Sequence, residues 1–177
     1  MKPLMRALFA TAALAAAVGD GRPVAADPDD PAGWFLNVDP RRRAFLTHTS
    51  TAGGPRLIMF GCLRDADTFT TMSSAVGPRE NLPRAVLRLS DAATRFEVAG
   101  EVVLYPRDGT ATFISDIDAD AVAMRAIGRR LMPLLSGTGD LAIDIGPADG
   151  AGVTRRAVLP RSGLATLLPR FADVCFR

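Results

Sequence analysis

The sequence predicts a mainly β (α+β) protein, an antiparallel β-sandwich or half-barrel with one longer helix and a short C-terminal helix. Two observations lead to this fold class. Short apolar or alternating runs separated by turn residues fill most of the chain before residue 118, and the apolar spacing becomes helical after it. Because strands and helices do not alternate, a parallel α/β fold is disfavoured. The 177 residues, 48% apolar and 23% charged, suit one globular domain.

Seven strands are expected before the first helix. The turns between them hold Gly, Pro and Asp, and Thr51–Pro55 is a strong turn signal. Arg56–Cys62 is apolar on both alternating faces, which is typical of a central buried strand. Gly100 interrupts an apolar row and predicts a bulge or bend. The seven strands are expected at residues 34–38, 43–50, 56–62, 68–72, 84–89, 94–105 and 110–115, with the longest loop at 73–83.

A helix is expected from about Asp118 to Leu135, because its apolar residues recur at helical spacing and include Val122. Acidic residues at its start complement the helix dipole. Pro133 should kink or end the last turn.

A second hairpin is expected after this helix, with strands at residues 140–146 and 153–159. A final short helix should follow from Gly163 to about Phe171, capped by Ser162, with Cys175 after its end.

The first 26 residues are typical of a secretory signal peptide. Lys2 and Arg6 form the positive region, residues 8–18 form the apolar region, and Val24–Ala26 supply small residues for cleavage. The apolar run is too short to span a hydrocarbon core of about 30 Å. We expect cleavage after Ala26, leaving residues 27–177 as a single β-rich domain that is periplasmic or secreted, with no transmembrane span.

Removal of this leader changes the net charge. The chain has 21 Lys and Arg against 19 Asp and Glu, and residues 1–26 hold three of the former and one of the latter. The mature chain then carries 18 of each, so charge gives no broad case for nucleic acid or an anionic membrane as partner. The local basic run Arg41–Arg43 is interpreted as a solvated strand entrance.

Cys62 and Cys175 are the two cysteines, and both lie in the exported part. An even number of cysteines in an oxidising compartment predicts one disulfide between them. Two separately buried thiols are the alternative. A zinc site is not expected, because two Cys and one His without short spacing do not form the usual ligand set.

A conventional catalytic set is not evident in the sequence. His48 is the only histidine, so a hydrolase would use it with Ser50, Ser162 or a reduced Cys62. A surface histidine on a sheet is the simpler interpretation of His48. No cofactor or catalytic residue is assigned, and enzymatic activity is left open with a preference against it.

Asp116–Asp120 has the opening spacing of a calcium loop. Ala121 stands at the position that needs Gly, and Ile127 at the position that needs a bidentate Glu. We therefore interpret the segment as a strand-to-helix junction with an acidic N-cap, with a weak cation site as the alternative. The aromatic side chains are interpreted as core, with an aromatic ligand cleft as the alternative.

The back half resembles small exported bacterial β-sandwich proteins. The resemblance is carried by Leu135–Ile143 (Leu-x-Gly-x-Gly-Asp-Leu-Ala-Ile), by Leu159–Ala165 (Leu-Pro-Arg-Ser-Gly-Leu-Ala) and by a closing helix with Cys175. These segments are similar to the invasion-associated locus B family and the type VI secretion-associated VasI family, over about residues 113–175. The resemblance implies a periplasmic accessory protein without catalysis.

The sequence therefore supports two hypotheses of function. The first is an exported, non-catalytic accessory or binding protein of the bacterial envelope, whose partner is another envelope protein or a small ligand. The second is a small periplasmic hydrolase that uses His48 with Ser50 or Ser162.

Overall fold

The structure, a computed structural model, describes residues 29–74, 79–106, 109–150 and 155–177. The expected signal peptide at residues 1–26 lies outside the described residues, as do the first two residues of the strand expected at 153–159. Within the described ranges the chain forms nine strands and two helices.

The strands lie close to the positions expected from the sequence. Their bounds are β1 Gly33–Asp39, β2 Arg43–Thr49, β3 Arg56–Leu63, β4 Thr68–Ser73, β5 Leu82–Ser90, β6 Arg95–Tyr105, β7 Thr110–Asp118, β8 Leu141–Pro147 and β9 Arg155–Leu159. The helices are α1 Ala121–Ser136 and α2 Leu164–Phe176. The strand β7 runs three residues further than expected, up to the start of α1.

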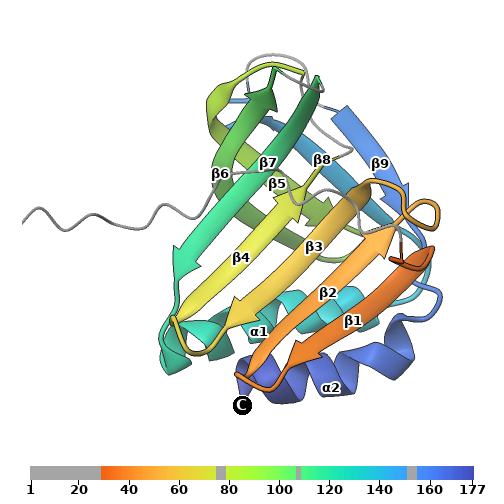
Figure 1. The fold of residues 1–177 in the computed structure, drawn as a ribbon, viewed down its shortest axis with the longest axis vertical. Helices are drawn as coiled ribbons and strands as arrows, with labels where there is room; N and C mark the ends of the chain where they lie inside the picture. Colours follow the sequence, from red (N-terminus) through yellow and green to blue (C-terminus); the bar gives the residue numbers. More distant parts are fainter. Residues whose placement is uncertain (1–28, 75–78, 107–108, 151–154) are drawn as a thin grey trace, which may run out of the picture.

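All nine strands belong to one antiparallel sheet in the order β1-β2-β3-β4-β7-β6-β5-β8-β9. The sheet curls so that β1 to β4 and β7 face the strands β5, β6, β8 and β9, and the two helices lie side by side below it (Figure 1). The fold is therefore a mainly β half-barrel with two helices, the second of them C-terminal, and the predicted fold class is confirmed.

The inner face of the curled sheet and the inward faces of both helices form one apolar core. On β2, β3 and β4 the inward residues are Leu46, Phe60 and Phe69, each fully buried. These strands are buried on both faces, because Thr47 and Met59 on the outward face are also largely inaccessible. Central strands buried on both faces have near-continuous apolar runs, as β3 does.

The two edges of the half-barrel are tied together by a hydrogen bond. Trp34 on β1 donates from Nε1 to the carbonyl oxygen of Pro160, the residue directly after β9, at 2.6 Å. Since β1 and β9 stand at opposite ends of the strand order, this contact links the first and last strands without a sheet ladder between them.

The expected bend at Gly100 is present. β6 pairs with β5 along its first half and with β7 along its second half, and the register of β5 shifts between Leu82 and Ala85. A Cβ atom at Gly100 would lie 2.3 Å from the carbonyl oxygen of Ile114 and 2.8 Å from the ring of Phe113. Glycine at this position therefore permits the close approach of β6 and β7 where the sheet bends.

Both helices differ from the expectation in detail. Val122 is not part of the apolar stripe of α1 but is 63% exposed. Pro133 lies inside α1, which continues to Ser136. In α2 the residue before the helix is Gly163, with φ of 87°, and Ser162 forms no cap. α2 passes through Pro169 and reaches Phe176, so Cys175 lies inside the helix and not after it.

Replacement of Gly100 by alanine should lower the free energy of unfolding by about 1–3 kcal/mol, because the added methyl group forces β6 and β7 apart. Denaturant-induced unfolding measures this difference. Glu101→Ala changes the exposed neighbour on the same strand and should stay within about 0.5 kcal/mol of the natural protein. Equal stability of Gly100→Ala and the natural protein would contradict the close approach.

Candidate functional site

The predicted disulfide between Cys62 and Cys175 is present. Their Cα atoms are 5.6 Å apart, and both side chains are fully buried. Cys62 lies on β3, flanked by Ala44 on β2 and Phe69 on β4. The bond therefore joins the last turn of α2 to β3, one residue before that strand ends.

His48 is buried, and its interpretation as a surface histidine is wrong. Only 4% of the residue is exposed. On β2 it shares the inward face with Ala44 and Leu46. Its ring meets the ring of Trp34 edge-on, with 4.9 Å between centroids, and its Nδ1 atom has no hydrogen-bond partner among the described residues. Removal from water lowers the pKa of His48 below its ordinary value of 6.5.

The residues that a hydrolase would use with His48 do not share its buried position or are not free to react. Ser50 and Ser162 are exposed, whereas His48 is enclosed in the core. Cys62 is held in the disulfide and has no free thiol. The ring contact of His48 is with Trp34, which is not a nucleophile.

Arg161 joins segments that are far apart in the sequence. Its side chain, only 6% exposed, donates from Nη2 to Asp91 Oδ2 at 2.5 Å and to the carbonyl oxygen of Leu134 at 2.7 Å. Nη1 donates to the carbonyl oxygens of Thr138 and Gly139. Arg161 thus satisfies the carbonyl group of Leu134 in the last turn of α1, together with two carbonyl groups of the turn that follows the helix.

Backbone hydrogen bonds hold the carboxylate of Asp91, the anionic partner of Arg161, in place. Its carboxylate accepts hydrogen bonds from the backbone N–H groups of Ala93 and Thr94, at 2.9 and 2.8 Å. These two bonds, followed by the bond from Arg161, hold the pKa of Asp91 well below its usual range. The turn between β5 and β6 is therefore connected to the end of α1 through a charged pair.

A groove lies between α1 and α2 with Arg161 in its wall. It has a volume of about 350 Å³ and is lined mainly by apolar side chains, which include Met132, Leu135, Leu164 and Leu168. The Nε atom of Arg161 is buried and has no hydrogen-bond partner among the described residues. The volume of this groove falls at the lower end of the range found for small-molecule pockets.

The outward face of β5, β6, β8 and β9 carries a row of alternating charges. Arg156, Asp144, Arg88 and Glu97 stand opposite one another on adjacent strands, and neighbouring members form ion pairs at 2.9 to 3.1 Å across two of the three steps. A hollow of about 540 Å³ lies beside this row at the β5–β6 turn. Because each ion pair joins a partly buried side chain to an exposed one at the surface, these pairs add little to stability.

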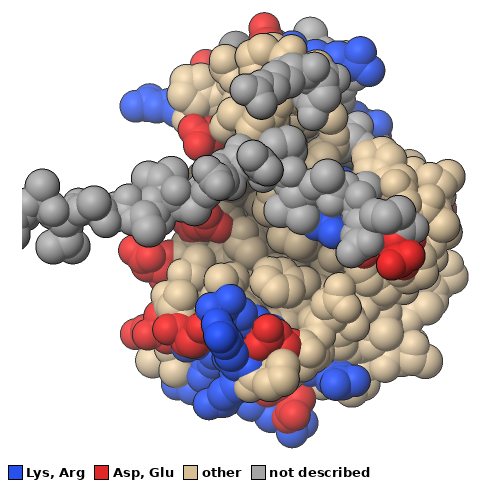
Figure 2. All heavy atoms as spheres, in the orientation of Figure 1, with Lys and Arg blue, Asp and Glu red and all other residues tan. Residues whose placement is uncertain are grey.

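The remaining motifs have structural explanations. Asp120 is the N-cap of α1, and its carboxylate accepts hydrogen bonds from the N–H groups of Val122 and Ala123. In the described part of the chain, no group of three or more His, Cys, Asp or Glu side chains is arranged to hold a metal ion. In the basic run, Arg43 forms a bidentate pair with Asp65, and Figure 2 shows acidic and basic groups mixed where these turns lie. Most aromatic rings are buried in the core, as expected.

Sequence reasoning missed Arg161 and the buried state of His48. The partners of the Arg161 side chain lie in three places, the β5–β6 turn, the last turn of α1 and the turn after it, and no spacing in the sequence predicts these contacts. For His48 a signal was available, because it has the same strand parity as Ala44 and Leu46.

The fold and the buried disulfide between Cys62 and Cys175 together define the chain as a disulfide-bonded antiparallel half-barrel covered by two helices. No family model matches the chain, and no curated protein matches it. Among solved structures it is similar to the crystal structure of invasion-associated protein B from Bartonella henselae, with 12% identity and a TM-score of 0.42, over 81% of this chain and 94% of that chain. This match agrees with the resemblance expected from the sequence.

The burial of His48 should make stability depend on pH. Because its pKa is lower in the folded than in the unfolded chain, the folded chain binds this proton less readily. The contribution of neutral His48 to the free energy of unfolding is then fully present above about pH 6.5 and is lost as the pH falls through the folded-state pKa. His48→Phe keeps a ring beside Trp34 without the charge, and should remove this part of the loss between about pH 7 and 5, where most carboxylates stay ionised. Unfolding curves at several pH values test this, and parallel losses in both proteins would refute it.

Proposed function

We propose that the protein is an exported, non-catalytic accessory or binding protein of the bacterial envelope. In this proposal residues 1–26 are a signal peptide, and residues 27–177 form a single β-rich domain in the periplasm or outside the cell. The observation that carries the proposal is the buried bond between Cys62 and Cys175. Disulfides form and persist in oxidising compartments and are rare in the bacterial cytosol.

The position of the bond also supports this proposal. It closes a loop of 113 residues in sequence separation, which corresponds to about 4–5 kcal/mol of stabilisation in the chain-entropy model. A small domain typically has only about 5–15 kcal/mol in total. A protein that depends on one bond to this extent requires a compartment in which the bond is maintained.

Binding is favoured over catalysis by the surroundings of the residues concerned. His48 packs against Trp34, and Ser50 and Ser162 are exposed to solvent. The groove between α1 and α2 provides an apolar space for a small ligand, and another envelope protein is the other class of partner that we propose. No helix among the described residues is both long enough and apolar enough to cross a membrane.

The export proposal predicts cleavage after Ala26. Expressed in a bacterium with its own leader, the protein should fractionate with the periplasm and begin at Asp27, as shown by its intact mass. Ala26→Arg removes the small residue that the peptidase needs and should leave the leader attached. Recovery of the natural protein from the cytoplasm with residues 1–26 retained would refute the proposal.

The disulfide should be a principal source of stability. Cys62→Ala and Cys175→Ala should each lower the free energy of unfolding by about 2–5 kcal/mol. Since either change removes the same bond, the double variant should lose little more than one single variant. Denaturant unfolding of all four proteins measures this, and a double variant with the full sum of both losses would show that packing, and not the bond, is responsible.

A further inference from the structure

We propose that the outward face of α1 docks the protein on an anionic phospholipid surface. This face carries Arg125 and Arg129, with Arg130 at its flank, and all three are exposed. No acidic residue lies between Ala121 and Ser136. The inference goes beyond the proposed export, because lipid binding by the purified protein does not depend on the compartment in which it is made.

These arginines differ from many others in the protein. Arg43, Arg56 and Arg88 each pair with a carboxylate, and Arg161 pairs with Asp91. Among the described residues, Arg125, Arg129 and Arg130 form no ion pair. The ion pairs that neutralise arginines on the sheet are thus missing from the outward face of α1.

The spacing between Arg125 and Arg129 slightly destabilises α1. Arg125 and Arg129 are four residues apart in a helix, and like charges at this spacing destabilise it slightly. Glutamate or glutamine at either position would remove the repulsion without loss of helix propensity. A function that uses concentrated positive charge accounts for this arrangement.

The packing of α1 fixes the direction of the charges. Met124, Leu131 and Leu135 on the opposite side of the helix are fully buried against the sheet. Arg130 extends over the ring of Phe96, 5.6 Å from its centroid, so its orientation is fixed without neutralisation by a carboxylate. The charges therefore project outward from a rigid support.

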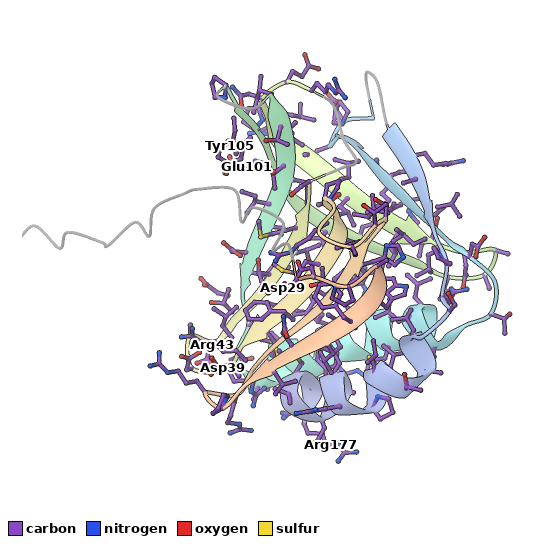
Figure 3. All side chains as sticks on the ribbon, turned by 45° about the vertical axis from the view of Figure 1, so that its right-hand side comes forward. Asp29, Asp39, Arg43, Glu101, Tyr105 and Arg177 are labelled. Carbon is purple, nitrogen blue, oxygen red and sulfur yellow. A yellow bond between two sulfur atoms is a disulfide. The ribbon has the colours of Figure 1, made fainter. Side chains whose placement is uncertain are left out.

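The neighbouring helix extends the same basic surface. α2 lies beside α1 below the sheet (Figure 1), and its Arg170 is exposed and without an ion pair in the described part of the chain. Arg177 and Asp173 neutralise each other at 2.7 Å, and Figure 3 shows Arg177 at the outer end of this layer, far from Glu101 and Tyr105. We refer to Arg125, Arg129, Arg130 and Arg170 as the helix-layer arginines.

A flat lipid surface fits these residues better than a soluble polyanion does. Arginine binds phosphate groups through paired N–H donors. The exposed Val122, among the arginines on α1, is an apolar side chain that a headgroup layer can accommodate. Because the mature chain is expected to carry no net charge, a polyanion wrapped around it meets as many acidic as basic groups. A planar surface meets the helix layer alone.

The expected strength of binding is modest. Each Arg close to an anionic bilayer contributes about fivefold to partitioning, or about 1 kcal/mol. Two of these residues together then account for a factor of roughly 25. Binding of this kind is reversible and decreases at high salt, because the Debye length falls to about 3 Å at 1 M.

The test is sedimentation of the purified mature protein with vesicles of phosphatidylcholine alone or mixed with phosphatidylglycerol in equal parts. The variant Arg125→Gln with Arg129→Gln removes two charges from α1. Its matched control, Arg79→Gln with Arg84→Gln, removes two exposed charges near the start of β5. There β5 pairs with the last residues of β8, at the end of β8 that lies far from α1. Thermal unfolding of both variants confirms that they are folded.

We expect the natural protein and the β5 control to bind the mixed vesicles and not the vesicles of phosphatidylcholine alone. The α1 variant should bind the mixed vesicles roughly 25-fold more weakly. Three outcomes overturn the proposal: no binding to the mixed vesicles, an equal loss in both double variants, or binding to polyglutamate without binding to vesicles. The last of these indicates an acidic protein as the partner of this face.

Discussion

The bond between Cys62 and Cys175 connects the two layers of the molecule at one buried point, and the other features of the fold are arranged around it. A curled sheet with an apolar inner face must be covered, because exposed apolar surface of this extent is unfavourable in water. α2 alone is a helix of 13 residues with a proline inside it, and a helix of this length is marginal without tertiary contacts. The covalent attachment to β3 keeps α2 on the sheet, and α1 packs beside it. Arg161 and Trp34 then fix the start of α2 to the end of α1 and to β1.

Much of the fold could be predicted, because its signals are local. Alternation along β3 and β6, the Asp120 cap and the change to helical spacing each depend on a few neighbouring residues, and each element is found near its expected place. The end of the last helix, expected near Phe171, lies instead at Phe176. The low helix propensity of proline favours an early end near Pro169, but continuation of the helix buries the side chains of Phe171 and Cys175.

The functional surfaces were harder to predict, because they depend on how distant segments meet. His48 stands among Thr47, Thr49 and Ser50, and these polar neighbours concealed its inward parity. Arg161 has no local signal at all. The net charge expected for the mature chain gave no broad case for an anionic partner, yet an average of this kind could not reveal that Arg125, Arg129 and Arg130, which form no ion pair among the described residues, lie together on α1. Composition averages over the surface, whereas recognition uses one face at a time.

The order of the elements along the chain has a consequence for biogenesis. Every strand precedes α2, so a chain that emerges from a ribosome or a translocon in sequence order presents the whole sheet before its cover. The pairing of β4 with β7 must also wait until β5 and β6 have emerged. During this interval the inner face and the unjoined edges of β1 and β9 are open to aggregation. The bond between Cys62 and Cys175 can form only after all nine strands have emerged, so it closes the molecule last in this order.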